Sequence, residues 1–296
     1  MQRDRGRNWH LETRGVARKA HGIVLYAFYL FTLTPPGRLT PRNWRFPTRD
    51  GGFSPREKRG QHMQNKVAFL RTEELIKLLI DQKALLFGEF TLKSGVKSPY
   101  YINMAKALKT AEGVASIGMS LAGYVYANFL EKSLPEDRRV DPSKLFIFGP
   151  AYKGIPLATA TAFALYEKFN INVRWGFNRK EAKLHGDKDD TFMMGDLQDG
   201  DSIIILDDVI TSGATKLEAK EQIETATGFK NLKFIAVVAV LDRFEGALEI
   251  RQQIDVYAVL RMDQVMKTCK ANKWVTDAQY TMFDEYFKVH GLVQKD

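Results

Sequence analysis

Short apolar runs alternate with helix-forming segments through most of the chain, and this alternation restricts the folds open to it more than any other feature. The runs are "KLFIF", "NVRWGFN", "SIIIL", "KFIAVVAVL" and "IDVYAVL". Strands buried on both faces lack strict polar–apolar alternation, and helices between successive strands are typical of a parallel sheet. From about Lys66 onward we therefore expect an α/β fold with a central, mostly parallel sheet flanked by helices. Such sheets bind ligands at the carboxyl ends of their strands.

Four helices are predicted around this sheet. Their ranges are 72–87, 113–132, 154–169 and 215–226. In the first, Leu75, Leu79 and Leu86 recur near helical spacing, and the second has a face of small residues suited to close packing. Thr215 and Glu218 have the spacing of a capping box at the start of the fourth.

The excess positive charge of the chain is confined to its first 62 residues. These hold 13 Lys and Arg against 4 Asp and Glu, a net charge of +9, which equals the formal net charge of all 296 residues. The remainder has 31 residues of each sign and no net charge. For the body of the protein, charge therefore indicates neither a nucleic-acid partner nor a membrane partner.

Residues 1–62 are Arg-rich and contain one apolar run, Ile23 to Leu33, which is shorter than the roughly 20 residues of a membrane span. Three interpretations stay open: a signal-like segment without a clean cleavage site, an Arg-rich transit peptide, and an over-extended start site. We favour the last, because balanced composition and helical patterning return at Met63. We expect 1–62 to be a poorly ordered extension and 63–296 to be the folded domain.

Cys269 is the only cysteine of the chain, so no intrachain disulfide forms and a reducing, cytoplasmic location is expected. No metal-binding or catalytic cysteine motif surrounds it. We interpret it as a surface or partly buried thiol without a chemical role.

The stretch "IIILDDVITSGAT", residues 203–215, places Asp207 and Asp208 at the end of an apolar strand. Paired acids suit either a divalent cation or the two vicinal hydroxyls of a sugar. The "TSGAT" that follows offers hydroxyls and backbone N–H groups at a helix N-terminus, where a phosphate group is favoured, and Gly213 lets the loop approach it closely. The stretch therefore predicts a site for a ribose 5-phosphate. GxxxxGK[ST] does not occur in the sequence, which disfavours ATP hydrolysis of the P-loop type.

The stretch 203–215 resembles the phosphoribosyl-diphosphate (PRPP) signature of type I phosphoribosyltransferases, and four further motifs narrow the resemblance to the orotate phosphoribosyltransferase family. They are "FTLKSGVKSPYYIN" at 90–103, "GPAYKGIPLA" at 149–158, "FNRKEAKLHGD" at 177–187 and "VLDRFEG" at 240–246. In order, they resemble the orotate segment of that family, its diphosphate loop, its mobile catalytic loop and its arginine turn. The resemblance covers about Lys66 to the C-terminus.

This resemblance implies a type I phosphoribosyltransferase fold with a small N-terminal hood region and a mobile catalytic loop. It implies Mg²⁺-dependent transfer of the 5-phosphoribosyl group of PRPP to orotate, which yields orotidine 5′-monophosphate and diphosphate in pyrimidine (UMP) biosynthesis. It further implies a homodimer with shared active sites. Mg²⁺ would be held mainly through PRPP and water near Asp207 and Asp208, with no firm direct protein ligand.

By resemblance, the catalytic residues are Lys183, His185, Asp207 and Asp208, and Lys183 and His185 would reach the site of the other subunit. The basic residues of the 177–187 loop would collect the negative charge of the leaving diphosphate. The PRPP-binding residues implied by the resemblance are Lys93, Tyr152, Lys153, Arg179, Lys180, Lys183, His185, Asp207, Asp208, Val209, Ile210, Thr211, Ser212, Gly213, Ala214 and Thr215. Ala214 stands where many relatives have Thr, which leaves the hydroxyl contact with the 5′-phosphate to Thr211, Ser212 or Thr215.

Orotate is a flat, anionic ring that requires an aromatic face and a cation. By resemblance, Tyr101 and Ile102 match the positions of the family's stacking pair, although Ile102 departs from the second aromatic that is frequent there. Arg243 would pair with the orotate carboxylate, and Thr211 would hydrogen-bond to the same ligand.

Three alternatives compete with this interpretation. A purine phosphoribosyltransferase would need a different base-binding region in place of 90–103 and 240–246. A regulator that senses PRPP and binds nucleic acid could dispense with Lys183 and His185. A fused enzyme that also decarboxylates the product would need a second domain of ~200 residues, and the chain ends too soon after the transferase motifs to hold one.

Overall fold

The structure is a computed structural model, and it describes residues 72–92, 94–179, 193–210, 214–245 and 248–292. All of these belong to the second of the two units into which the chain divides, Gln64–Asp296. The expectations for residues 1–62 lie outside the described residues. The same holds for Lys93, Lys180, Lys183, His185, Thr211, Ser212 and Gly213, and for the side chains of Ala214 and Thr215.

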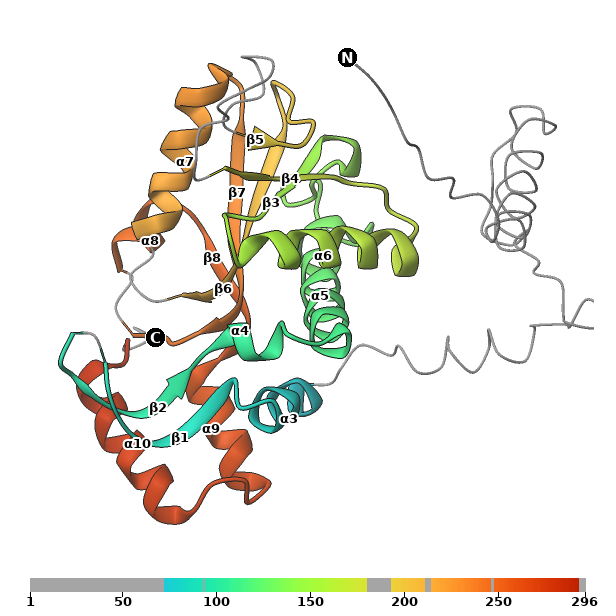
Figure 1. Cartoon of the computed structure of the whole chain (residues 1–296). Helices are drawn as coiled ribbons and strands as arrows, with labels where there is room; N and C mark the ends of the chain where they lie inside the picture. Colours follow the sequence, from blue (N-terminus) through green and yellow to red (C-terminus); the bar gives the residue numbers. More distant parts are fainter. Residues whose placement is uncertain (1–71, 93, 180–192, 211–213, 246–247, 293–296) are drawn as a thin grey trace, which may run out of the picture. The chain divides into compact units, whose positions relative to one another are not determined.

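A six-stranded sheet with the order β5-β4-β3-β6-β7-β8 forms the centre of the described unit (Figure 1). The strands are β3 (Leu145–Phe148), β4 (Arg174–Asn178), β5 (Met193–Met194), β6 (Ser202–Ile210), β7 (Lys233–Asp242) and β8 (Val256–Arg261). Every neighbouring pair is parallel except β4 and β5. The predicted α/β fold with a mostly parallel sheet is confirmed, and all five apolar runs are strands.

The strand order reverses between β3 and β6. From β3 the chain first adds β4 on one side, and only later adds β6 on the other side. In doubly wound sheets, the carboxyl ends of the strands at such a switch point form the ligand site. The register pairs Phe148, the last residue of β3, with Ile205, so β6 continues past the end of β3 through Leu206 to Ile210. Asp207 and Asp208 lie in this overhanging part of β6.

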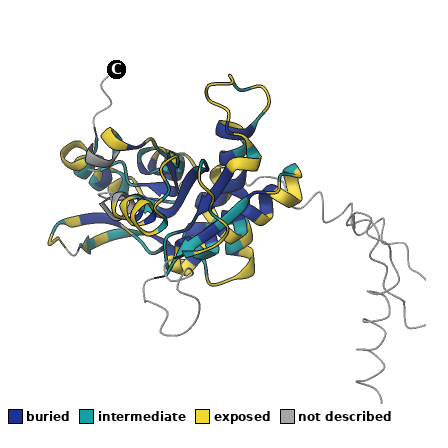
Figure 2. Cartoon of the chain, turned by 90° about the horizontal axis from the view of Figure 1, so that it is seen from above, coloured by how far each residue is buried: buried dark blue, intermediate teal, exposed yellow. Residues whose placement is uncertain are grey.

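Helices cover both faces of the sheet, as its doubly buried strands require. One face packs against α5 (Ala111–Val125) and α6 (Gly154–Phe169), and the other against α7 (Ala214–Thr227) and α8 (Leu248–Gln253). Alternate residues of β6 serve the two cores: Ile204 and Leu206 face the first, and Ile203 and Ile205 face the second. Figure 2 shows these central strands as buried.

The predicted small-residue face lies in α5. A Cβ atom built on Gly118 would come within 2.4 Å of the Ala160 Cβ of α6, so α5 and α6 cross at a distance that only glycine permits. A π-helix, Tyr126–Leu130, continues α5. By length and composition the combined helix Ala111–Leu130 could cross a membrane, but 56% of its most apolar window is buried inside the protein, as in the core helix of a water-soluble fold.

A smaller substructure adjoins the sheet. It contains α3 (Thr72–Asp81), the antiparallel hairpin of β1 (Leu85–Thr91) and β2 (Lys97–Ile102), α4 (Met104–Ala107), α9 (Met262–Ala271) and α10 (Asp277–His290). A short 3-10 turn, Pro142–Lys144, is separate from this substructure and directly precedes β3. In Figure 1 the hairpin lies beside α10.

Two details of the predicted helices are wrong. The first helix ends at Asp81 and Leu86 belongs to β1, because Lys83 has a left-handed backbone (φ 56°) that stops the helix. The fourth helix begins at Ala214, so Thr215 lies inside it and is not its N-cap.

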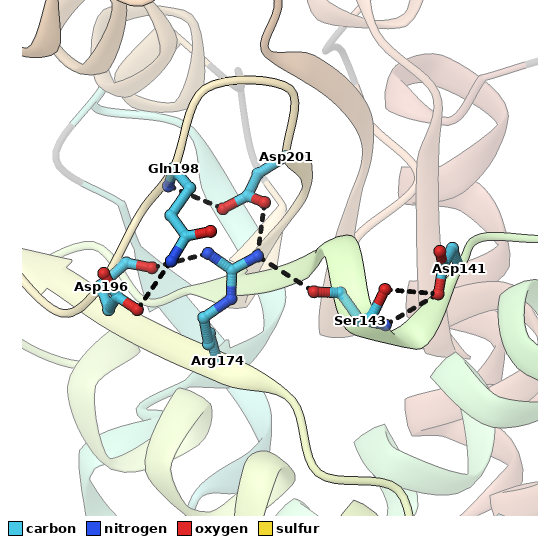
Figure 3. A network of polar contacts seen from close by, with 6 residues as sticks. All are labelled: Asp141, Ser143, Arg174, Asp196, Gln198 and Asp201. Atoms are coloured by element: carbon cyan, nitrogen blue, oxygen red, sulfur yellow. Dashed lines mark hydrogen bonds and ion pairs between the residues drawn. The ribbon is translucent and has the colours of Figure 1, made fainter.

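A polar network closes the end of the sheet opposite the carboxyl ends of β3 and β6 (Figure 3). Arg174, the first residue of β4, forms an ion pair with the buried Asp201 (Nη2–Oδ1 2.5 Å) and donates to the carbonyl oxygens of Asp196 (2.9 Å) and Ser143 (3.1 Å). The Gln198 backbone N–H donates to the other oxygen of Asp201 at 2.8 Å. Arg174 thus holds together the starts of β3, β4 and β6.

Candidate active site

The loop after β3, residues 149–153, folds back tightly onto the start of α6. A Cβ atom on Gly149 would come within 2.1 Å of the Gly154 carbonyl oxygen, and one on Gly154 within 2.5 Å of the Gly149 carbonyl carbon. Only glycine therefore fits at either position. The Asn178 side chain at the end of β4 accepts a hydrogen bond from the Ala151 N–H at 2.8 Å, which ties the loop to the neighbouring strand. The Ala151–Tyr152 peptide bond is cis.

The two predicted acids lie within β6 and are nearly buried, with 9% of Asp207 and 8% of Asp208 exposed. We expected both at the end of the apolar strand, but β6 continues past them to Ile210, and Asp207 pairs with Ala239 of β7. Because successive strand residues point to opposite faces, Asp207 continues the row of Ile205 and Asp208 that of Leu206. The two carboxylates therefore flank the end of β6 from its two faces.

Lys153 connects the loop after β3 with the end of β6, the two strands that flank the switch point. Its Nζ atom lies 2.7 Å from Oδ2 of Asp208, in a charge-assisted hydrogen bond. The Lys153 side chain is half exposed and that of Asp208 is 12% exposed, so the pair forms the border between buried and solvent-accessible parts of the site. Tyr152, beside it, is exposed. The structure thus brings together predicted residues from two motifs that are about 55 positions apart.

Arg179 lies at the end of β4, immediately before the segment that carries the other predicted basic residues. Its Nη2 atom contacts the Met194 Sδ atom of β5 at 2.8 Å. The strands on either side of that segment are paired, Phe177 with Met194 and Asn178 with Met193. Asn178 and Met193 are therefore adjacent at the carboxyl end of β4, whereas the second end of the predicted catalytic loop, 177–187, lies outside the described residues.

The hairpin presents Tyr101 and buries Tyr100. Tyr101 is 41% exposed, and its ring centre lies 5.5 Å from that of Phe90 on the paired strand, whereas Tyr100 is fully buried. Ile102 is half-buried and packs against the core. Of the predicted stacking pair, Tyr101 is the residue that offers an aromatic face to a ligand.

Arg243, the predicted carboxylate partner, is held by protein groups on one side. Its Nε–H donates to the Tyr100 hydroxyl at 3.2 Å, and Nη2 lies 3.0 Å from Oε2 of Glu245. The guanidinium carbon is 4.9 Å from the centre of the Tyr100 ring, a cation–π distance. Burial would lower the pKa of Arg243, but Tyr100 and Glu245 outweigh it and hold the pKa above its usual value.

Sequence reasoning missed the residues that hold Arg243. Tyr100 donates its hydroxyl hydrogen to Oε1 of Glu245, and Tyr286 donates to Oε2 at 3.1 Å. Burial, followed by the nearby Glu245 charge, raises the pKa of both tyrosines, so both stay neutral donors. A signal was present: Glu245 follows Arg243 by two residues, and a buried tyrosine normally requires a hydrogen-bond partner.

Other groups of chemical interest lie apart from this site. Within the described ranges, no three His, Cys, Asp or Glu side chains gather in a way that would hold a metal ion. Burial raises the pKa of Cys269 to about 12, so its thiol is not a nucleophile, and it lies deeper than the surface or partial burial we expected. A cavity of about 880 Å³ at the amino ends of β6 and β7 is lined by equal numbers of acidic and basic residues.

Comparison with known proteins gives the chain clear relatives. No protein-family model matches it. It is 37% identical over 200 residues to the orotate phosphoribosyltransferase of Pseudomonas fluorescens, covering 66% of this chain and 86% of that protein. It is 32% identical over 233 residues to the orotate phosphoribosyltransferase of Agathobacter rectalis, covering 74% and 96%.

Two solved structures resemble the fold closely enough to compare. The orotate phosphoribosyltransferase of Francisella tularensis superposes with a TM-score of 0.60 at 28% identity, covering 76% of this chain and 100% of that one. Leishmania donovani UMP synthase superposes with a TM-score of 0.56 at 25% identity, covering 78% of this chain and 46% of the longer one. The chain aligns with most of the length of these bacterial enzymes at 32% and 37% identity, and its fold resembles that of a solved member. The chain therefore belongs to the orotate phosphoribosyltransferase family.

Proposed function

We propose that this enzyme of pyrimidine biosynthesis binds PRPP across the carboxyl ends of β3 and β6 and transfers its 5-phosphoribosyl group to orotate. The products are orotidine 5′-monophosphate and diphosphate. The observation that carries the proposal is the contact between Lys153 and Asp208, because it joins a cation suited to diphosphate with an acid suited to a sugar diol at the switch point.

The pentose is assigned to the overhanging end of β6. Asp207 and Asp208 would accept hydrogen bonds from its two hydroxyl groups, and their burial keeps competing water away. The 5′-phosphate is assigned to the residues between β6 and α7, where the amino end of a 14-residue helix favours an anion. This part of the proposal includes Val209, Ile210, Thr211, Ser212, Gly213, Ala214 and Thr215.

The diphosphate is assigned to the loop after β3. Lys153 would turn from Asp208 to the diphosphate when PRPP binds, while backbone groups near Tyr152 and the cation of Lys93 complete the site. The leaving group gains charge as its bond to the sugar breaks, so cations fixed around it stabilise the transition state more than the ground state.

Further positive charge is assigned to the segment after β4. Arg179, Lys180, Lys183 and His185 would surround the diphosphate, and closure of the segment would exclude water from the oxocarbenium-like sugar. We propose that Lys183 and His185 act in the site of the partner in a homodimer.

Mg²⁺ is assigned to the same end of the sheet. Buried carboxylate oxygens and PRPP oxygens are hard ligands of the kind that Mg²⁺ prefers, so Asp207 and Asp208 fit a metal held mainly through PRPP and water. The bound ion would neutralise part of the diphosphate charge.

Orotate is assigned to the space between the hairpin and the turn after β7. Tyr101 would stack on the ring beside Ile102, and Arg243 would meet the carboxylate with the part of its guanidinium that Glu245 leaves open. Thr211 is assigned to the same ligand.

The folded enzyme is proposed to span residues 63–296 and to act in the cytoplasm. A single buried cysteine requires no oxidising compartment. Transfer to a purine base and a purely sensory role are the alternatives, and neither is favoured, because the relatives that align over most of their length are orotate phosphoribosyltransferases.

The direct test follows orotate absorbance in the presence of PRPP and Mg²⁺, with the full chain and with a version that begins at Met63. Orotate consumption that requires all three components is expected from both proteins. Adenine, guanine and hypoxanthine serve as control acceptors. Turnover of a purine base without turnover of orotate, or no turnover at all, would overturn the proposed reaction, and loss of activity only in the shorter protein would reject the domain boundary.

A further inference from the structure

Four polar side chains from three distant parts of the chain meet on the side of β2 opposite Tyr101. They are Tyr100 of β2, Arg243 and Glu245 of the turn after β7, and Tyr286 of α10. We refer to them as the Arg243 cluster. Arg243 and Glu245 each expose only 13% of their side chains.

The cluster fixes the guanidinium of Arg243 from one side. Nε–H donates a hydrogen bond to the Tyr100 hydroxyl at 3.2 Å, and the Tyr100 hydroxyl donates a hydrogen bond to Oε1 of Glu245. Oε2 of Glu245 lies 3.0 Å from Nη2 of Arg243 and accepts from Tyr286 at 3.1 Å. Both carboxylate oxygens are therefore engaged, whereas Nη1 of Arg243 makes no hydrogen bond to any residue that the structure describes.

Helix α10 also holds the turn that carries Arg243. Phe244 has a left-handed backbone (φ 56°), which is unusual for a bulky residue and requires support from its surroundings. That support comes from a stack with Phe287 of α10 and from the Leu292 N–H, which donates to the Phe244 carbonyl at 2.8 Å. Asp242 accepts from the Phe244 N–H at 2.8 Å. Because Phe244 is held, Arg243 and Glu245 on either side of it are held as well.

We infer that Glu245 and Tyr286 are positioning residues of the orotate site: through the Arg243 cluster, helix α10 sets the direction in which the Nη1 group of Arg243 faces its ligand. This inference rests on the role that the proposed function gives to Arg243. It gives helix α10 a part in base recognition. Tyr286 of this helix and Tyr100 of the hairpin are 186 residues apart in the sequence, and both donate to Glu245.

The physical reason lies in the flexibility of arginine. A free arginine side chain loses much rotamer entropy when it binds a ligand, and this loss lowers affinity. The cation–π contact with Tyr100, the hydrogen bond at Nε and the ion pair at Nη2 restrict that freedom in the folded protein, before orotate arrives. Glu245 also offsets the charge of the largely buried cation, and the hydrogen bond from Tyr286 keeps Glu245 in place.

The test uses Tyr286→Phe, which removes one hydroxyl and keeps the ring beside Tyr100 (6.2 Å between ring centres) and His290 (4.4 Å). We expect the KM for orotate to rise roughly tenfold and the KM for PRPP to change less than twofold. Tyr280→Phe is the matched control on the same helix, because its ring contacts Lys270 and its hydroxyl makes no hydrogen bond to the described residues. Melting temperatures of both variants show whether the fold persists.

A double-mutant cycle with Arg243→Lys distinguishes positioning of Arg243 by Tyr286 from a general stabilisation of the fold by Tyr286. If Tyr286 acts through Arg243, Tyr286→Phe adds no further rise in the KM for orotate once residue 243 is lysine. A full additional rise in that background would overturn the inference. So would a Tyr286→Phe enzyme that behaves like Tyr280→Phe while Arg243→Lys alone weakens orotate binding.

The same cycle separates this inference from the proposed function. An unchanged KM for orotate in Arg243→Lys would reject the assignment of Arg243 to orotate, and with it the positioning role. A raised KM in Arg243→Lys together with normal kinetics in Tyr286→Phe leaves the assignment of Arg243 standing and rejects only the part given to α10.

Discussion

Lys153 and Asp208 neutralise each other at the point where β3 and β6 end. An acid that is 12% exposed would pay a large desolvation cost if its charge had no partner, so the lysine makes it possible to keep a carboxylate there before PRPP binds. In the proposed complex, PRPP would offer each group a new partner, so the carboxylate of Asp208 would not be left buried alone.

Replacing Lys153 by Met is therefore expected to raise the KM for PRPP at least about tenfold and to change the KM for orotate little, because a charged contact with the diphosphate is lost. Lys168→Met on the exposed last turn of the same helix is the control. Steady-state kinetics with each substrate varied in turn measure both values. Equal effects on the two KM values, or no effect on PRPP, would contradict the assignment.

Among single residues, the sequence identified those whose chemistry is visible in a local pattern. Asp207 and Asp208 follow an apolar run, and their burial at a strand end agrees with that pattern. Tyr100, Glu245 and Tyr286 were missed because their shared contact depends on three elements that come together only in the folded chain. Periodicity along the sequence carries no information about contacts between residues of distant elements.

Secondary-structure elements were predicted well where burial determined their pattern. Strands β3, β6 and β7 are buried along most of their length, and their apolar runs reflect it. Strands β4 and β8 are mostly half-buried, yet each still contains an apolar run long enough to indicate a strand. The hairpin of β1 and β2 was missed because Leu86 fits helical spacing, and the break at Lys83 depends on a backbone angle that lysine rarely adopts. Helix α10 has a sequence signal, since Thr276 and Gln279 form a capping box, but its apolar and aromatic residues do not follow one clear helical stripe, and Phe283 is its one buried residue.

The polar network around Arg174, which we call the joint, is expected to stabilise the sheet at the amino ends of β3, β4 and β6. Arg174→Ala leaves Asp201 buried without its ion-pair partner, and the free energy of unfolding should fall by about 3 kcal/mol. The control is Lys77→Ala, which removes an exposed i,i+4 pair with Asp81 and should cost less than about 0.5 kcal/mol. Urea denaturation measures both, and similar midpoints for the two variants would refute the importance of the joint. Orotate KM should stay unchanged in Arg174→Ala, because the joint lies at the opposite end of the strands.

At the level of the assembled enzyme, the proposed homodimer makes each active site depend on two chains. Asp208 would come from one chain and Lys183 from the other. Lys183→Ala and Asp208→Asn homodimers should each be nearly inactive, because every site then lacks one of the two groups.

A hybrid of the two variants restores one complete site. Random exchange makes about half of the dimers hybrids, each with one intact site of two, so a mixture should recover about a quarter of the wild-type activity. Differently tagged subunits allow the hybrid to be purified and assayed. A verified hybrid without activity would contradict shared sites, and unmixed Lys183→Ala with normal turnover would reject the role of Lys183.

The two-residue strand β5 has a consequence for how such enzymes diverge. Because β5 pairs with β4, Asn178 and Met193 lie side by side at the edge of the sheet, so the residues between them begin and end at the same place. Natural variation can lengthen, shorten or replace that stretch without moving any neighbouring strand. Changes to the proposed catalytic loop would then alter turnover and leave the stability of the sheet in place.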